Sequence, residues 1–371
     1  MSWKVPFIDY PAHYQKMEAE LTNLIKDVLF TRADLILRDD LRQFEHNIAS
    51  FIGVKYAVGV GNCTEAIYLS LKAARIQPGD EIITVGHTFV ATVSSIVHCG
   101  AIPILVDIAE DFNLDVAKIE KAITTKTKAI IPVHLNGRLC NMKKITEIAS
   151  KYRLLIIEDA AQALGGKFDG ELAGSFGLSG CFSFFPAKIL GAAGDGGLVC
   201  TNNKDFADKV YLLRDHGRLN KTDIAFYGFN SRLDNLQAAI LNAKLKYLPE
   251  WITRRRQVAK LYQDGLEGLK EITLPPKPDL DNKYFDVFQN YVIRHKKRGL
   301  LVDYLKKAGI ETLISWPKPM HYQNALNLNH FRLPLTEQIS NEVISLPMNT
   351  EISDNQVRYV VDTIHKFFRE H

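Results

Sequence analysis

Short apolar segments alternate with helical ones along residues 65–159, and this rhythm constrains the fold more than any other feature of the sequence. Apolar runs predict strands at 80–85, 102–108, 128–135 and 153–159. Amphipathic spacing predicts helices at 65–74, 91–100, 115–123 and 142–152. Strands that are joined by crossover helices form a parallel sheet covered on both faces, so the sequence predicts an α/β fold.

The carboxyl-terminal third has a different pattern. One long helical stretch is predicted over 232–266, which would lead out of the sheet domain. Beyond it the pattern predicts a strand, a helix and a terminal helix, at 284–295, 298–309 and 354–370. A further amphipathic helix is predicted near the amino end, at 15–30. We therefore expect a large domain, residues 1–245, and a smaller α/β domain, residues 246–371.

The composition is that of a globular protein without a membrane segment. Hydrophobic residues make up 46% of the chain and charged residues 24%, which disfavours a disordered chain or a coiled coil. No apolar run approaches the roughly 20 residues that a bilayer span needs, and the first residues lack the pattern of a signal peptide. We therefore expect a cytoplasmic protein with no membrane partner.

Charge and cysteine content disfavour further classes. The net charge of +4 is spread thinly along the chain, which argues against a nucleic-acid partner. The five cysteines form no C-x-x-C pair, so neither a disulfide framework nor a metal site is expected. No G-x-G-x-x-G follows the early strands, which disfavours a nicotinamide enzyme.

Lys188 stands in the stretch CFSFFPAKILGAAGDGG, residues 181–197, between an aromatic run and a segment of Gly and Ala. A charge in apolar surroundings costs several kcal/mol unless it is paired or neutralised. Two interpretations remain open from these residues. The ammonium either reaches water along its apolar stem, or it has a lowered pKa and reacts with a carbonyl.

Three further features lie where predicted strands end. Asp159 is either a helix N-cap or a carboxylate that holds a cationic ring nitrogen. The turn at 61–64 leads into a helix, where free N–H groups favour a phosphate. Phe89 is either a core residue or an aromatic platform. Together with Lys188, these features are what one ligand, pyridoxal 5'-phosphate, requires.

Several stretches also resemble a known family. These are GVGNCTEAIYL, IIEDAAQALGG, CFSFFPAKILGAAGDGG, RDHGRLNKTDIAFYGFNSRLDNLQAAIL and SLPMN. They resemble the DegT/DnrJ/EryC1/StrS sugar aminotransferases, and the similarity runs from VPFIDY near the amino end to SLPM near the carboxyl end. The resemblance implies the aspartate aminotransferase fold type I, in which a mostly parallel sheet between helices forms a large domain beside a smaller one.

The resemblance also implies roles for individual residues. Lys188 matches the lysine that forms a Schiff base with the cofactor and acts as the general base. Asp159 matches the carboxylate that pairs with the pyridinium nitrogen. The other matched positions are Gln162 at the phenolic oxygen, Phe89 on the ring face, Ser183, Cys63 and Thr64 at the phosphate, and Asn230, which relatives supply from the neighbouring subunit of a homodimer.

The implied activity is a ping-pong transamination from L-glutamate to a nucleotide-linked ketosugar, through pyridoxamine 5'-phosphate and with release of 2-oxoglutarate. It would serve the biosynthesis of an amino sugar for a surface polysaccharide, such as lipopolysaccharide, or for a glycosylated metabolite. The segment ILGAAGDGG, which contains Asp195, resembles relatives that aminate C3. Amination at C4 and a non-catalytic regulatory protein that binds the cofactor are the alternatives. Relatives that dehydrate sugars have histidine in place of Lys188, which disfavours that reaction.

Three positions depart from the family pattern. Cys63 stands where many relatives have glycine, and Trp316 stands where tyrosine is common. The stretch LILRDD around Arg38 replaces a segment that usually contains glycine. We expect the segments around Arg38 and Trp316 to lie near the substrate, so these departures concern its identity and leave the cofactor assignment unchanged.

Overall fold

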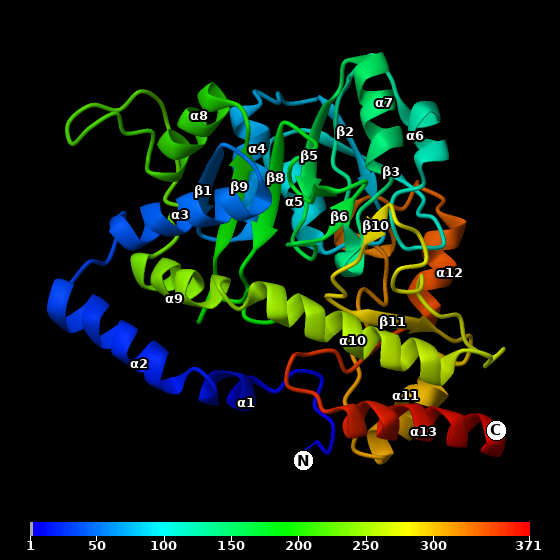
Figure 1. Cartoon of the computed structure of the whole chain (residues 1–371). Helices are drawn as coiled ribbons and strands as arrows, with labels where there is room; N and C mark the ends of the chain where they lie inside the picture. The colour runs from blue at the N-terminus through cyan, green and yellow to red at the C-terminus, as the bar shows by residue number, and fades with distance from the viewer. Residues whose placement is uncertain (1–2) are drawn as a thin grey trace.

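A seven-stranded sheet forms the larger part of the fold in a computed structural model, which describes residues 3–371 (Figure 1). The strand order is β1-β9-β8-β5-β4-β2-β3. Only β9 runs antiparallel to its neighbours, so the sheet is mostly parallel, as predicted. The strands are β1 (Tyr56–Val60), β2 (Glu81–Val85), β3 (Ile102–Val106), β4 (Thr127–Ile130), β5 (Leu155–Asp159), β8 (Ser179–Ser183) and β9 (Gly197–Thr201).

Helices cover both faces of this sheet because successive strand residues point to opposite sides. Ile82 belongs to one apolar cluster and Ile83 to another, and Cys181 and Phe182 are divided in the same way. Both clusters are buried, which explains the nearly continuous apolar runs in the sequence. The covering helices are α3 (Asp39–Ile52), α4 (Cys63–Ala73), α5 (Val90–His98), α6 (Val116–Ala122), α7 (Met142–Tyr152), α8 (Lys204–Arg214) and α9 (Asn235–Leu245).

The helix predicted at 15–30 is divided into pieces. Helix α1 (Tyr10–Gln15) begins earlier than predicted, and α2 (Glu18–Lys26) passes directly into a π-helix, η1 (Asp27–Arg32). Pro11 in the first turn of α1 favours the earlier start. The N–H groups of the first turn have no partner within a helix, so a proline there loses no hydrogen bond. Figure 1 shows α2 lying apart from the sheet, on the far side of α9.

The helical stretch predicted over 232–266 is two helices, α9 and α10 (Leu248–Leu266). Pro249 lies in the first turn of α10, where its missing N–H is tolerated, but it could not continue α9 without loss of a hydrogen bond. The predicted strand at 284–295 is likewise two short strands, β10 (Tyr284–Phe285) and β11 (Tyr291–Arg294), with an irregular segment at 286–290 between them.

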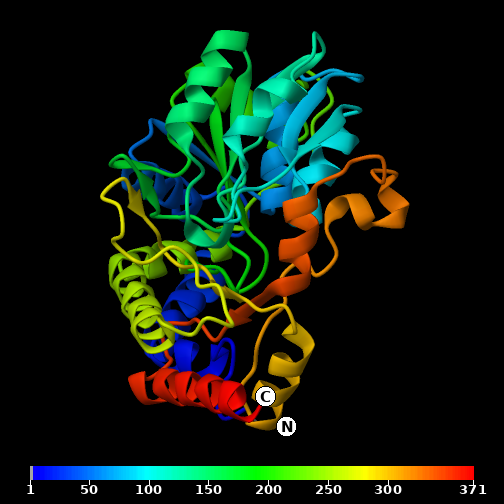
Figure 2. The same cartoon turned by 90° about the vertical axis from the view of Figure 1, so that its right-hand side faces the viewer.

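The carboxyl-terminal elements pack around a third apolar cluster. Strand β11 pairs antiparallel with β12 (Val343–Leu346), and Figure 2 shows α13 beside α10 at the base of the molecule, with both termini near it. The remaining elements are β6 (Lys167–Phe168), β7 (Glu171–Leu172), α11 (Arg298–Lys307), α12 (Pro334–Glu342), α13 (Asp354–Glu370) and the short 3-10 helices η2 (Leu135–Gly137), η3 (Met320–Tyr322) and η4 (Asn324–Leu326).

No helix in residues 3–371 has the length and apolar character needed to cross a membrane. Nor do these residues contain a cluster of three or more His, Cys, Asp or Glu side chains that could hold a metal ion. All five cysteines are free and buried.

Candidate active site

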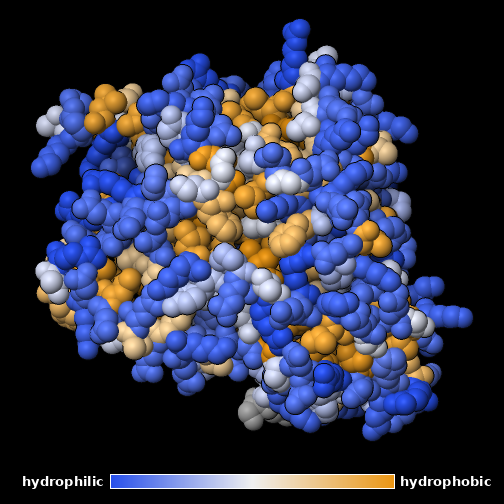
Figure 3. Space-filling model, in the orientation of Figure 1, coloured by the Kyte–Doolittle hydropathy of each residue, from blue (hydrophilic) through white to orange (hydrophobic). Residues whose placement is uncertain are grey.

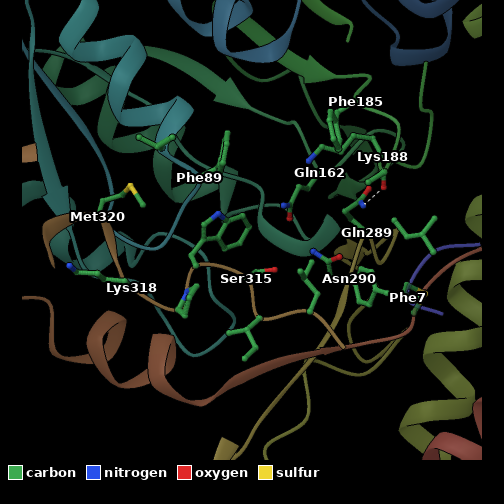
Figure 4. A pocket seen from close by; sticks show the side chains of 18 of the residues that line it. Phe7, Phe89, Gln162, Phe185, Lys188, Gln289, Asn290, Ser315, Lys318 and Met320 are labelled. Atoms are coloured by element: carbon green, nitrogen blue, oxygen red, sulfur yellow. Dashed lines mark hydrogen bonds between the residues drawn. The ribbon is translucent and has the colours of Figure 1, made fainter. Parts of the chain in front are cut away.

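A cavity of about 700 Å³ opens where the parallel strands end. Phe89 follows β2, Gln162 follows β5 and Lys188 follows β8, and all three line it. The opposite wall comes from the irregular segment before β11 and from residues 313–318 (Figure 4). The carboxyl ends of strands in an open α/β sheet are where ligands gather, so these three residues line a cavity in a position typical of a binding site.

Lys188 lies in a loop that is closed by backbone hydrogen bonds. Its own N–H donates to the Phe185 carbonyl at 2.8 Å, and the Ala192 N–H donates to the Phe184 carbonyl at 2.7 Å. Within residues 3–371, Nζ has neither a hydrogen-bond partner nor an ion pair. Burial lowers the pKa of Lys188, although the Cys63 thiol when ionised and the Asp159 carboxylate oppose this. A lowered pKa increases the share of neutral, nucleophilic amine.

Asp159 is a buried carboxylate at the end of β5, and 6% of its surface is exposed. Thr92 Oγ1 donates a hydrogen bond to Oδ2 at 2.7 Å, and the Ala161 N–H donates to Oδ1 at 3.3 Å. Burial raises the pKa of Asp159, while these two donors lower it. Among the described residues it forms no ion pair, so a cation that arrives with a ligand would find a buried carboxylate without a counter-ion.

Phe89 and Gln162 lie beside this carboxylate. Phe89 is the N-cap residue of α5, and Thr92 in the first turn of the same helix donates to Asp159, so the start of α5 both carries the aromatic ring and holds the carboxylate. The ring is 59% exposed, into the cavity. Gln162 Oε1 accepts a hydrogen bond from the Asn136 N–H at 2.7 Å, which leaves its Nε2 as a donor for a ligand.

The predicted phosphate residues come together where β8, β9 and α4 meet. Ser183 pairs with Gly197 across the two strands. A Cβ at Gly197 would lie 2.3 Å from the Asn62 carbonyl carbon, so the close approach of β9 to the turn before α4 requires glycine. The first N–H groups of α4, at Cys63 and Thr64, lie at this junction, where a helix N-terminus favours an anion.

The environment of Cys63 places it in the same site as the two charged groups. Burial raises the pKa of its thiol, the Asp159 carboxylate adds to this, and the Lys188 ammonium acts against it. Asn230, in contrast, lies outside the cavity; it is exposed and bridges to Asp215. Asp195 and Arg38 are also exposed and do not line the cavity of this chain.

The wall opposite Lys188 contains one expected residue and several that were not predicted. Trp316, which was expected near the substrate, lines the cavity, and its backbone has a left-handed φ of 50°. Its neighbour Lys318 lies at the end of the cavity away from Lys188 (Figure 4). The sequence WPKP at 316–319, an aromatic residue followed by a cation between two prolines, could have suggested this wall. The other unpredicted lining residues include Phe185, Gln289, Asn290 and Ser315.

The chain is similar to known proteins over nearly its whole length. A sequence model of the DegT/DnrJ/EryC1/StrS aminotransferase family matches residues 15–365. The chain is 41% identical to a "pleiotropic regulatory protein" of Geobacillus stearothermophilus, over 98% of this chain and 99% of that protein. It is 40% identical to the dTDP-3-amino-3,6-dideoxy-alpha-D-galactopyranose transaminase of Aneurinibacillus thermoaerophilus, over 98% and 99% of the two chains.

A solved structure has nearly the same backbone. The crystal structure of S. venezuelae DesV superposes with a TM-score of 0.95 at 35% identity, over 99% of both chains. At this level of similarity the elements that carry Lys188, Asp159 and Phe89 belong to a fold that the two proteins share.

Proposed function

The chain belongs to the DegT/DnrJ/EryC1/StrS aminotransferase family, and on that premise we propose that it transfers an amino group from L-glutamate to C3 of a nucleotide-linked ketosugar, with pyridoxal 5'-phosphate as cofactor. The observation that carries this proposal is the combination of Lys188 and Asp159. One is an amine in the cavity that has no hydrogen-bond partner among the described residues, and the other is a buried carboxylate that forms no ion pair with them.

The residues of the site fit this cofactor by their chemistry. Asp159 would hold the protonated ring nitrogen, and the exposed ring of Phe89 would lie against the face of the pyridine. Gln162 would donate from Nε2 to the phenolic oxygen. The phosphate would be bound by Ser183 and the first N–H groups of α4, at Cys63 and Thr64.

Lys188 would act as the acid and base of both half-reactions. When bound, pyridoxal 5'-phosphate supplies an aldehyde for the amino group and a ring that withdraws electrons. The lowered pKa of Lys188 leaves more of its amine able to take a proton from the α-carbon of glutamate. In the second half-reaction the same amine would deliver a proton to the carbon that becomes aminated. Asp159, held by Thr92, keeps a negative charge at the ring nitrogen throughout.

The cavity also supports an anionic, sugar-containing acceptor. Among residues 3–371, Lys188 and Lys318 are the charged residues that line it, and Lys318 is exposed and flanked by Pro317 and Pro319. An exposed ammonium at the mouth of a cavity whose described lining contains no carboxylate suits a diphosphate. Asn290 and Ser315 supply polar groups between the two lysines, and Trp316 supplies an apolar face for a sugar ring.

The choice of C3 is supported by a relative and by the sequence around Asp195. The Aneurinibacillus relative, 40% identical to this chain, is named as the transaminase of a 3-amino sugar. Asp195 lies in a segment that resembles C3-specific relatives, although it does not line the cavity of this chain. Amination at C4 is the alternative. The cavity walls that would orient the sugar are largely apolar, so they provide few directional hydrogen bonds that would favour C3 over C4.

A purely regulatory role is the second alternative. It has support in the name of the Geobacillus relative. A binding protein would need the cofactor contacts but no free amine of lowered pKa beside the buried carboxylate. Because Lys188 and Asp159 are both in place, catalysis explains the site better.

We also propose that the active form is a homodimer in which Asn230 reaches the partner's cofactor phosphate. Residues 216–229 project from the body next to α8 (Figure 1), and Figure 3 shows apolar side chains among hydrophilic ones on this projecting part. Leu219, Ile224 and Tyr227 of this segment are exposed, Tyr227 fully. Apolar side chains on a projecting segment suit a self-complementary contact with a second copy.

The test is incubation of the purified protein, pyridoxal 5'-phosphate and L-glutamate with matched 3-keto and 4-keto nucleotide sugars. NMR of the product locates the new amine. We expect an amino sugar from the 3-keto compound and none with the Lys188→Ala variant. An amine at C4 would replace the proposed position, and no product from any nucleotide ketosugar would favour the regulatory alternative.

A further inference from the structure

Gln289 contacts the backbone on both sides of Lys188. Its Oε1 accepts a hydrogen bond from the Ile189 N–H at 3.1 Å, and its Nε2 donates to the Ala187 carbonyl at 2.9 Å. Figure 4 shows Gln289 beside Lys188, with the bond to Ala187 drawn. One planar amide therefore holds the two residues that flank Lys188, as a neighbouring strand would.

This contact matters because the loop that carries Lys188 has no regular secondary structure. The direction of a side chain in such a loop depends on tertiary contacts. Ile189 and Leu190 are buried in the main apolar cluster, which fixes the loop beyond the lysine. On the other side Pro186 and Ala187 are only half-buried, so the bond to the Ala187 carbonyl is the polar anchor of that side.

Gln289 is itself held firmly. It is 7% exposed, and its carbonyl accepts a hydrogen bond from Nη1 of Arg255, which is also buried and donates to the Phe288 carbonyl. From the opposite side, Gly137 packs against the same segment. A Cβ at Gly137 would lie 2.8 Å from the backbone nitrogens of both Phe288 and Gln289, so the approach requires glycine, whose φ here is +94°.

We propose that Gln289 is a positioning residue that fixes the peptide groups beside Lys188 and so sets the direction from which Nζ reaches the reacting carbon. This inference rests on the proposed function, because it takes Lys188 as the residue that moves the proton. A proton transfer requires close alignment of the amine with the carbon, and a misplacement of about 1 Å can lower its rate by roughly a hundredfold. In this role Gln289 does not contact the reacting atoms. It acts through the backbone of the loop that carries Lys188.

The test compares Gln289→Leu with a matched control, Gln263→Leu. Leucine is similar in size to glutamine and removes both hydrogen bonds. Gln263 is also a buried glutamine of the carboxyl-terminal part; its Oε1 accepts a hydrogen bond from the Tyr291 hydroxyl at 3.2 Å, and it does not touch the loop of Lys188. A loss that arises only from reduced stability should appear in both variants.

Two readouts separate positioning from stability. The first is the rate at which pyridoxal 5'-phosphate attaches to Lys188 in the cofactor-free protein, trapped by borohydride and located by peptide mass spectrometry. The second is the single-turnover rate with glutamate, measured over a range of glutamate concentrations and below the melting temperature of each variant. We expect Gln289→Leu to lower both rates by roughly ten- to a hundredfold with little change in the glutamate concentration at half-maximal rate.

Gln289→Glu provides a second variant if Gln289→Leu does not fold. Its carboxylate can still accept from the Ile189 N–H but cannot donate to the Ala187 carbonyl, so we expect rates between those of the wild type and of Gln289→Leu. Equal rates in the Gln289 variants and Gln263→Leu would overturn the inference. Failure of the wild-type protein to attach the cofactor at Lys188 would instead count against the proposed function.

Discussion

Replacement of Asp159 by asparagine tests the electronic role of the buried carboxylate. The side chain keeps its shape, but one of the two oxygens becomes an amide nitrogen. In the wild-type protein, Thr92 Oγ1 and the Ala161 N–H donate to different oxygens of Asp159. In the variant, one of these two donors would face an N–H group instead of an acceptor. The ring nitrogen of the cofactor would also lose its anionic partner, and the neutral ring would withdraw electrons less well.

The expected magnitude follows from the hydrogen bond that is lost. A hydrogen bond to a charged group contributes about 1.5–3 kcal/mol, which corresponds to a roughly 10- to 150-fold weaker binding of the cofactor. The rate with glutamate should fall by at least as much, since the negative charge at Asp159 matters more as electrons move into the ring. Cofactor affinity is measured by absorbance titration, and the rate by single turnover at saturating cofactor.

Asp107→Asn is the matched control. Asp107 is a second buried aspartate after a sheet strand, and it accepts hydrogen bonds from the Leu335 and Thr336 N–H groups and from Thr336 Oγ1. Its loss should lower stability but leave the glutamate rate of the folded protein within about threefold of the wild type. The reasoning is refuted if Asp159→Asn behaves like this control in both assays.

Three further predictions concern other parts of the account. Lys188→Ala should still bind pyridoxal 5'-phosphate without covalent attachment, so its spectrum should match that of free cofactor, and glutamate should not convert the cofactor to its amino form. A mixture of Lys188→Ala and Asn230→Ala chains should regain about a quarter of the wild-type activity after subunit exchange, because half of the dimers are mixed and each has one intact site; no recovery despite proven exchange would place each site within one chain. Burial alone would raise the pKa of Glu351, but hydrogen bonds from His13, Lys16 and Thr350 outweigh it and lower the pKa to about 2. The stability from this depressed pKa is present above about pH 4.5 and is lost as the pH falls toward 2. The melting temperature should therefore fall less on acidification for Glu351→Gln than for the wild type, and equal decreases would contradict this.

The parallel part of the sheet could be predicted because its strands are buried on both faces. Such strands read as short apolar runs, and Ile82 and Ile83 illustrate this, since they enter different clusters. Element ends were harder to predict. The apolar spacing of α9 and α10 is continuous, and only Pro249 indicates that the two helices are separate.

The candidate site could be predicted in part, for the same reason. Asp159 and Phe89 lie where predicted strands end, so the sheet brings them to one edge. Lys188 follows β8, which was not predicted, and it was singled out only as a cation in apolar surroundings. Gln289 was missed because residues 284–295 read as a single strand, in which an amide would simply face solvent. Its position depends on the contacts of Arg255 and Gly137, which are distant in sequence and leave no local pattern.

The most direct test of the central claim is the first half-reaction, measured by stoichiometry. Protein loaded with pyridoxal 5'-phosphate is mixed with L-glutamate in the absence of any sugar, and the 2-oxoglutarate formed is quantified against the number of chains. We expect one 2-oxoglutarate for each loaded chain, with conversion of the cofactor to its amino form and loss of its covalent bond to Lys188. Formation of no 2-oxoglutarate by protein whose cofactor is attached at Lys188 would contradict the claim that this chain is a glutamate-dependent aminotransferase.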